Sequence, residues 1–123
     1  MNYTACIQPM KTYLKVTVNG TMESFEDMAD FADLLRKLSE EYDLNWALLD
    51  QRKLRRNLDV LDIYTLAEDD ITAKAAARGV RVACLPSPED REFAESMETI
   101  LHNRSVSYRV FSDPNDAVAW LTR

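Results

Sequence analysis

Residues 80–90, with the sequence Val-Arg-Val-Ala-Cys-Leu-Pro-Ser-Pro-Glu-Asp, decide the fold class of this chain. The first six form a short apolar run of the kind found in strands that are buried on both faces of a sheet. Ser87 is placed as the N-cap of a helix and Pro88 as its first residue, and two acids follow where they suit the helix dipole. A buried strand followed at once by a capped helix predicts a largely parallel α/β sheet.

The same succession continues toward the C-terminus. The helix that follows the cap has an apolar stripe at helical spacing, made of Phe93, Met97, Ile100 and Leu101. Val106 to Phe111 predicts a last strand, and Asp113-Pro114-Asn115-Asp116 repeats the cap pattern at the start of a terminal helix. The last third of the chain therefore predicts strand, helix, strand and helix.

Toward the N-terminus, Asn45 to Asp50 contains the apolar run Trp46-Ala47-Leu48-Leu49, which predicts another buried strand. A helix follows, and Arg78-Gly79 ends it with a C-terminal cation and a C′ glycine. This interpretation puts Glu68-Asp69-Asp70 in the middle of that helix, on its solvent-exposed side. The buried side is predicted to comprise Val60, Ile63 or Tyr64, Ala67, Ile71 and Ala75.

The first part of the chain predicts a hairpin and a helix. Tyr3 to Ile7 and Tyr13 to Val18 are β-prone, and Asn19-Gly20 ends the second strand with a turn signal. The helix begins near Thr21 or Ser24. Its apolar stripe comprises Phe25, Met28, Phe31 or Ala32, Leu35, Leu38 and Tyr42.

The predicted order is β-β-α-β-α-β-α-β-α. It describes an α/β fold in which a mixed, mostly parallel five-stranded sheet carries four helices. No Pro/Ser-rich linker and no repeat divides the sequence, so residues 1–123 are interpreted as a single domain. A chain of 123 residues buries roughly two thirds of its unfolded surface, which is enough for a core without disulfides or metals.

The composition narrows the possible partners and the compartment. The formal charge is −6, and an acidic surface disfavours nucleic acid and anionic membranes as partners. No signal peptide and no apolar run long enough for a membrane span are visible. Cys6 and Cys84 are interpreted as reduced, buried side chains within strands, so a cytoplasmic location is expected.

Nothing in the sequence predicts catalysis or a cofactor. The single histidine, His102, lies at a helix end, where a cation complements the terminal carbonyl groups. Together with the two cysteines it does not provide the compact ligand spacing that zinc requires. Two isolated glycines, Gly20 and Gly79, cannot build a phosphate-binding loop. We therefore expect a protein that is not an enzyme and that carries no cofactor or metal.

The C-terminal third also carries a resemblance. Arg81 to Leu85, the capped helix, Tyr108-Arg109-Val110-Phe111 and the segment from Asp113 through Ala119-Trp120-Leu121 together resemble the ending of STAS domains. These are the bacterial anti-sigma-factor antagonists, and the similarity is to their SpoIIAA-like branch. The resemblance implies a non-enzymatic module that binds other proteins or small ligands.

In the antagonists, a strand ending in Asp leads to an Asp-Ser pair at the next helix, and phosphorylation of that serine controls association. Leu48-Leu49-Asp50 matches the strand end, but no serine or threonine lies between Asp50 and Thr65. Asp59 takes roughly the place of the phosphoacceptor, so the resemblance implies that the phosphoserine switch is absent. Asp59 is then either a helix cap or a mimic of the phosphorylated state.

The most distinctive local feature is a basic run, Arg52, Lys53, Arg55 and Arg56, which follows a buried strand. Open α/β sheets place ligand crevices at such strand ends, and cations there favour a phosphate, a nucleotide or an acidic protein surface. Together with Asp59, these residues form the predicted contact site. The alternative is a solvated loop whose arginines pair with nearby acids.

Two functional hypotheses remain open at this point. The first is a cytosolic regulatory module that binds a protein partner, or a second copy of itself as a homodimer, because acidic and basic regions are segregated along the chain. The second is a sensor or carrier of a small apolar ligand or nucleotide, with a pocket between the sheet and its helices. Methionines and aromatic side chains would line that pocket, but they fit a close-packed core equally well.

Overall fold

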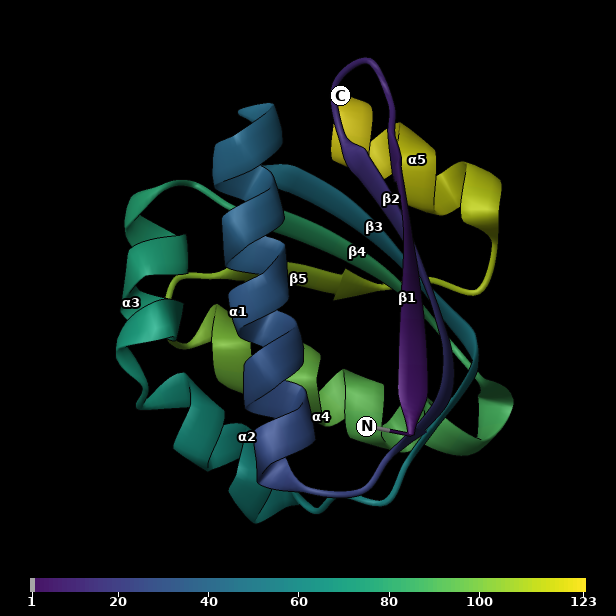
Figure 1. The fold of residues 1–123 in the computed structure, drawn as a ribbon, viewed down its shortest axis with the longest axis vertical. Helices are drawn as coiled ribbons and strands as arrows, with labels where there is room; N and C mark the ends of the chain where they lie inside the picture. The colour runs from purple at the N-terminus through teal and green to yellow at the C-terminus, as the bar shows by residue number, and fades with distance from the viewer. Residues whose placement is uncertain (1) are drawn as a thin grey trace.

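A computed structural model describes residues 2–123 of the chain. Its five strands form one sheet in the order β1-β2-β3-β4-β5 (Figure 1). The hairpin of β1 and β2 is antiparallel, and every other neighbouring pair is parallel. The strands are β1 (Tyr3–Pro9), β2 (Leu14–Met22), β3 (Trp46–Arg56), β4 (Arg81–Pro86) and β5 (Ser107–Val110). The predicted mixed, mostly parallel five-stranded sheet is confirmed.

The helices occupy the predicted places, but one of them is divided. They are α1 (Phe25–Tyr42), α2 (Val60–Ala67), α3 (Asp70–Ala77), the 3₁₀ turn η1 (Pro88–Asp90), α4 (Arg91–His102) and α5 (Pro114–Thr122). The single helix expected over residues 60–75 is wrong, since α2 ends before Glu68 and α3 begins after Asp69. Asp69 breaks it because its carboxylate accepts the backbone N–H of Ile71 at 3.0 Å, which makes it the N-cap of α3.

The second strand also runs further than its turn signal predicted. β2 continues through Gly20 to Met22, and Gly20 pairs with Tyr3 of β1. Gly20 has a φ of +108°, and a Cβ atom there would lie 2.4 Å from the carbonyl oxygen of Asn2. The glycine therefore permits a close approach between two strands, where the sequence indicated the end of one.

The helices cover the two faces of the sheet unequally. Helices α1, α2, α3 and α4 lie on one face, and α5 lies apart from them on the other (Figure 1). The first group buries what we call the larger core, which includes Val16, Leu49 and Ile63. Under α5, a smaller core joins Ala117 and Leu121 to the opposite side of β3 and β4. No helix within residues 2–123 is long and apolar enough to cross a membrane.

A bulge in β3 changes which of its side chains face the larger core. Thr17 of β2 pairs with Asp50 and Asn19 pairs with Lys53, so two residues of β3 oppose one of β2 between these pairs. One extra residue reverses the alternation of side chains along the rest of a strand. Before the bulge Leu49 and Gln51 face the helices, and after it Leu54 and Arg56 do. The bulge therefore turns one arginine of the basic run inward.

Candidate functional site

The basic run lies within a strand and not in the loop that was predicted. β3 extends to Arg56 because its last residues pair with the extension of β2, Thr21 opposite Arg55 and Met22 opposite Arg56. The four cations consequently do not share one surface. Arg52, Lys53 and Arg55 are exposed, whereas Arg56 is 8% exposed.

The exposed arginines of this run are paired with acids. Arg52 holds Asp50 at 2.8 Å, and its hydrogen bond lowers the pKa of that carboxyl group. Arg55 holds Glu89 at 2.9 Å. Lys53 makes no ion pair within residues 2–123. Arg52 and Arg55 therefore agree with the alternative in which a solvated segment pairs its arginines with nearby acids. Lys53 is the exposed cation of the run without such a pair within residues 2–123.

Asp59 is the N-cap of α2. Its carboxylate accepts the backbone N–H groups of Leu61 at 2.9 Å and Asp62 at 3.2 Å. The side chain of Asp62 accepts the backbone N–H of Asp59 in return, which completes a capping box. These hydrogen bonds agree with the interpretation of Asp59 as a helix cap.

The first turns of α2 expose an apolar surface that the sequence analysis missed. Leu61 is 68% exposed, Tyr64 50% and Val60 45%, and they lie on adjoining parts of one helix face. The sequence predicts Val60, and as an alternative Tyr64, on the buried side of this helix, and that prediction is wrong. The buried stripe is Ile63, Leu66 and Ala67, which turns the other face toward solvent.

Arg56 is a buried cation held by several neighbours. Its Nε lies 3.3 Å from Asp90 Oδ2, its Nη1 lies 3.5 Å from the sulfur of Met97, and its guanidinium stacks 4.7 Å above the ring of Phe93. Burial opposes its charge, but Tyr108, Cys84 and Asp90 together raise the pKa of Arg56 above its ordinary value. The side chain is therefore charged at neutral pH and is unavailable to a partner at the surface.

Two polar atoms beside Arg56 have no hydrogen-bond partner. They are the Nη2 of Arg56 itself and the hydroxyl group of Tyr108, a residue of β5 that is 7% exposed. Burial raises the pKa of Tyr108 well above its ordinary value, with nearby Cys84 and Arg56 also acting on it, so the hydroxyl keeps its proton. Both groups can donate a hydrogen bond, and the Tyr108 hydroxyl can also accept one.

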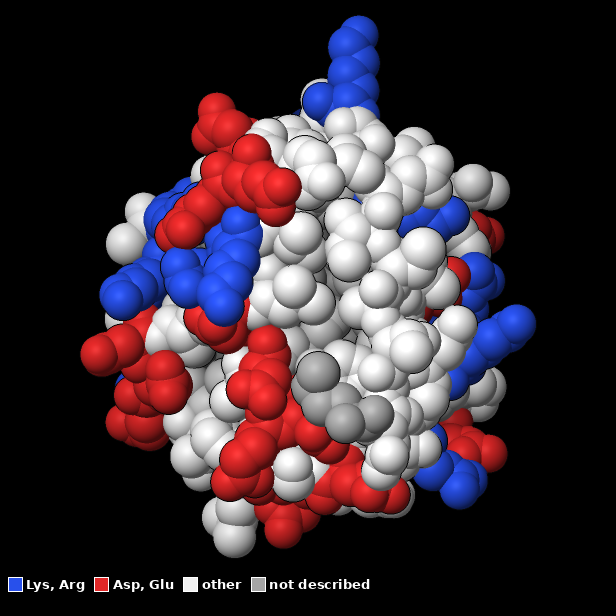
Figure 2. All heavy atoms as spheres, viewed as in Figure 1, with Lys and Arg blue, Asp and Glu red and all other residues white. Residues whose placement is uncertain are grey.

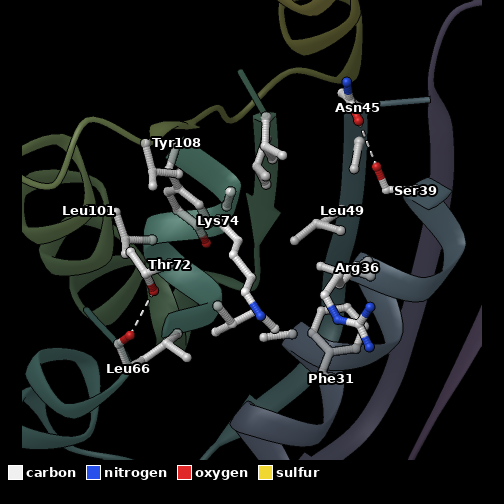
Figure 3. A pocket seen from close by; sticks show the side chains of 18 of the residues that line it. Phe31, Arg36, Ser39, Asn45, Leu49, Leu66, Thr72, Lys74, Leu101 and Tyr108 are labelled. Atoms are coloured by element: carbon white, nitrogen blue, oxygen red, sulfur yellow. Dashed lines mark hydrogen bonds between the residues drawn. The ribbon is translucent and has the colours of Figure 1, made fainter. Parts of the chain in front are cut away.

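These two residues line a cavity in the larger core. The cavity has a volume of about 340 Å³ and lies between the sheet and α1, α3 and α4. Figure 3 shows Tyr108 and Leu101 on one side of it and Leu49 and Phe31 on the other. Such a volume lies within the roughly 300–1,000 Å³ of small-molecule pockets, and an apolar wall with a few polar groups is their usual composition.

The cysteines and the histidine do not form a site. Cys84 is buried, and its thiol donates to Gln51 Oε1 at 3.3 Å, but Cys6 is exposed on the edge strand β1, so the prediction that both are buried is wrong for Cys6. His102 ends α4 as predicted. Within residues 2–123, no three side chains of His, Cys, Asp or Glu are grouped so that they would hold a metal ion.

No family model and no curated protein matches the chain. Solved structures do match it, and two of them do so over 98% of its length. One is an anti-sigma factor antagonist from Mycobacterium paratuberculosis, with a TM-score of 0.60, 9% identity and 95% of that chain covered. The other is an uncharacterized protein with a SpoIIAA-like fold from Shewanella loihica PV-4, with a TM-score of 0.55, 22% identity and 94% covered. The chain has a SpoIIAA-like fold.

This finding confirms the resemblance that the C-terminal third carried, at the level of the fold. The strand end expected at Asp50 is wrong, because β3 continues to Arg56, and a link of three residues, 57–59, then leads to α2. Lys53 precedes this link in β3, and the apolar surface of α2 follows it.

Proposed function

We propose that this protein is a non-enzymatic regulatory module of the cytoplasm that binds a protein partner through the start of α2 and the adjoining end of β3. The observation that carries the proposal is the exposure of Val60, Leu61 and Tyr64. They are three of the five large apolar side chains that are exposed among residues 2–123, and they follow one another on a single helix. Apolar side chains gathered in this way are typical of contact surfaces.

The energetics favour Leu61 and Tyr64 as the centre of that surface. Fully burying a leucine side chain contributes about 1.5–3 kcal/mol, and tyrosine is enriched among the few residues that dominate binding. The capping box at Asp59 fixes the first turn of α2, so a partner meets an ordered surface and loses little entropy on ordering it.

The exposed cations at the end of β3 indicate the charge of the partner. Lys53 makes no ion pair, and Arg52 and Arg55 are more than half exposed along their side chains despite their pairs with Asp50 and Glu89. A partner that offers an apolar groove to Leu61 and acidic side chains to this strand end fits both features. Arg56 belongs to the contact site that the sequence predicts, but it is buried and lies outside this surface.

The similarity to a solved anti-sigma factor antagonist supports a role in binding a protein partner. The absence of serine and threonine between Asp50 and Thr65 supports a module without the phosphoserine switch. Asp59 then holds α2 capped at all times, and association is controlled by some other means than phosphorylation at this position.

Affinity capture from cells that express the protein tests the proposal. Leu61→Asp puts a charge in the centre of the surface, and Tyr42→Asp is its matched control, because Tyr42 ends α1 and is 42% exposed. A partner that the wild type and Tyr42→Asp retain should be depleted about tenfold or more by Leu61→Asp. Equal retention by all three proteins would exclude this surface.

A second copy of the chain is the other possible occupant. Size-exclusion chromatography with light scattering gives the mass of the wild type and of Leu61→Asp. A monomer in both cases supports a different protein as the partner. A dimer that Leu61→Asp dissociates would assign the surface to self-association and would contradict the proposed occupant.

A further inference from the structure

We propose that the cavity of the larger core binds a fatty-acid-like ligand, whose carboxylate is held by Arg56 and Tyr108 and whose chain occupies the apolar remainder. This inference goes beyond the proposed partner surface. It stands on the cavity and on two unpaired donors, and neither of these belongs to the exposed face of α2.

The wall of the cavity is suited to a hydrocarbon chain. Strands β2 to β4 contribute aliphatic side chains such as Leu14, Leu49 and Val82. Phe31 of α1 and Leu101 of α4 close the space from the helix side, as Figure 3 shows. A hydrocarbon chain in an apolar space of this kind makes dispersion contacts with its wall, and these contacts stabilise the bound chain.

The polar end of the cavity supplies two buried groups that can donate hydrogen bonds. Arg56 Nη2 and the Tyr108 hydroxyl are buried and unpaired. Leaving a buried donor without a partner costs about 1–3 kcal/mol, and proteins rarely accept that cost twice in one place. A carboxylate has two acceptor oxygens and satisfies both donors, and hydrogen bonds between charged groups are the stronger kind.

A water molecule is the simplest alternative acceptor. It accepts both hydrogen bonds but leaves the apolar remainder of the cavity empty, whereas an amphipathic acid satisfies the donors and fills the space. Asp90 lies at the edge of the guanidinium that Nε and Nη2 share, with its Oδ2 3.3 Å from Nε. Nη2 carries a second N–H that points away from this edge, and this N–H is the donor assigned to a ligand.

The outer part of the cavity favours an anion as well. Arg36, Lys74 and Arg78 line it, together with Glu40. Figure 2 shows Lys and Arg side chains gathered between α1 and α3, and Figure 3 shows Lys74 reaching across from α3 toward α1. Arg36 and Arg78 are engaged with Glu40, whereas Lys74 has no ion pair within residues 2–123. These cations raise the local concentration of an anionic ligand before it enters.

Isothermal titration calorimetry with decanoate and with decan-1-ol tests the inference on the full chain, after delipidation. Wild-type protein should bind decanoate at least about tenfold more tightly than the alcohol, because only the acid makes charge-assisted hydrogen bonds to both donors. Tyr108→Phe removes one donor and should weaken decanoate binding about tenfold or more. Tyr3→Phe removes a tyrosine hydroxyl group outside the cavity, so it is the matched control and should change the affinity about twofold or less.

A second variant tests the apolar part separately. Leu49→Phe adds volume where Leu49 faces the cavity, so it should abolish decanoate binding while the protein remains folded by circular dichroism. Failure of wild-type protein to bind decanoate, or equal affinities of wild type and Tyr108→Phe, would overturn the inference. A larger loss with Lys74→Ala than with Tyr108→Phe would place the carboxylate at the outer end and would also overturn it. None of these results bears on partner capture by Leu61, so the two proposals fail separately.

Discussion

Tyr108→Phe should stabilise the ligand-free protein, which is the reverse of what most substitutions in a core do. The Tyr108 side chain is 7% exposed and its hydroxyl has no hydrogen-bond partner. Phenylalanine keeps the ring in place and removes only the unpaired group. The cost of burying an unsatisfied hydroxyl is about 1–3 kcal/mol, so we expect the free energy of unfolding to rise by about 1 kcal/mol or more.

Tyr3→Phe is the matched control, because the hydroxyl group of Tyr3 has a partner. It donates to the backbone oxygen of Asp27 at 3.4 Å, and its ring packs edge-on against Phe31 with 6.1 Å between centroids. The ring contact survives the substitution and the hydrogen bond does not. We expect the free energy of unfolding to fall by about 0.5–1 kcal/mol.

Urea unfolding followed by circular dichroism measures both variants against the wild type. The slope of the free energy with urea should be the same in all three proteins, so that the midpoints alone report the change. The decisive observation is the opposite sign of the two shifts. If Tyr108→Phe destabilises the protein as much as Tyr3→Phe does, its hydroxyl is satisfied in the ligand-free state, and the assignment of a ligand head group to it fails.

Three further expectations follow from the geometry. Asp59→Ala removes the N-cap of α2 and should lower the free energy of unfolding by about 1 kcal/mol. Asp59→Asn keeps a capping side chain and should retain most of the wild-type stability. Hydrogen exchange should show the first turn of α2 opening only in the alanine variant. Arg81→Ala removes the stacking of the guanidinium on Trp46 and Trp120 and its 2.7 Å hydrogen bond to the Trp120 carbonyl oxygen. The free energy of unfolding should fall by about 1–2 kcal/mol in urea. The backbone amide hydrogens of α5 should also exchange faster with solvent. Burial raises the pKa of Tyr108, so the folded protein keeps a proton that the unfolded chain loses above about pH 10. The free energy of unfolding should therefore fall as the pH rises beyond that point, by up to about 1.4 kcal/mol per pH unit from this group. Tyr108→Phe should make this fall less steep in urea unfolding at a series of pH values.

The element order could be read from the sequence because its signals are local. Ser24 and Asp113 cap helices where they were expected, with carboxylate or hydroxyl oxygens that accept a nearby backbone N–H. Apolar runs such as residues 46–49 form buried strands whatever their partners are. The mixed sheet follows from those elements and from the short connections between them.

The features that the sequence did not predict depend on distant partners. The bulge that turns Arg56 inward arises where β3 pairs with Asn19 of β2, and no local pattern in residues 50–56 indicates it. The exposure of Leu61 depends on which of two overlapping apolar stripes packs against the sheet, and periodicity accommodates both. The break at Asp69 is different, because an Asp that caps a helix start is a local signal. The apolar stripe continues through Ile71, so the sequence favours one unbroken helix over this break.

The candidate site was predicted in part. The sequence pointed to the end of β3 and to Asp59, and both lie at the link between β3 and α2. It treated four cations as one surface, although alternation along a strand divides them between two faces. The unpaired hydroxyl of Tyr108 could not be predicted, because a strand sequence does not reveal which polar groups lack partners.

The most direct test of the central claim is site-specific photo-cross-linking in cells that express the protein. A photoreactive amino acid at position 61 should trap a partner protein in a defined complex, and the same group at position 42 should not, although Leu61 and Tyr42 are both exposed on helices. A partner captured from position 61 alone is the predicted result. Equal capture from both positions, or capture from position 42 alone, would contradict the claim that the protein acts through the start of α2.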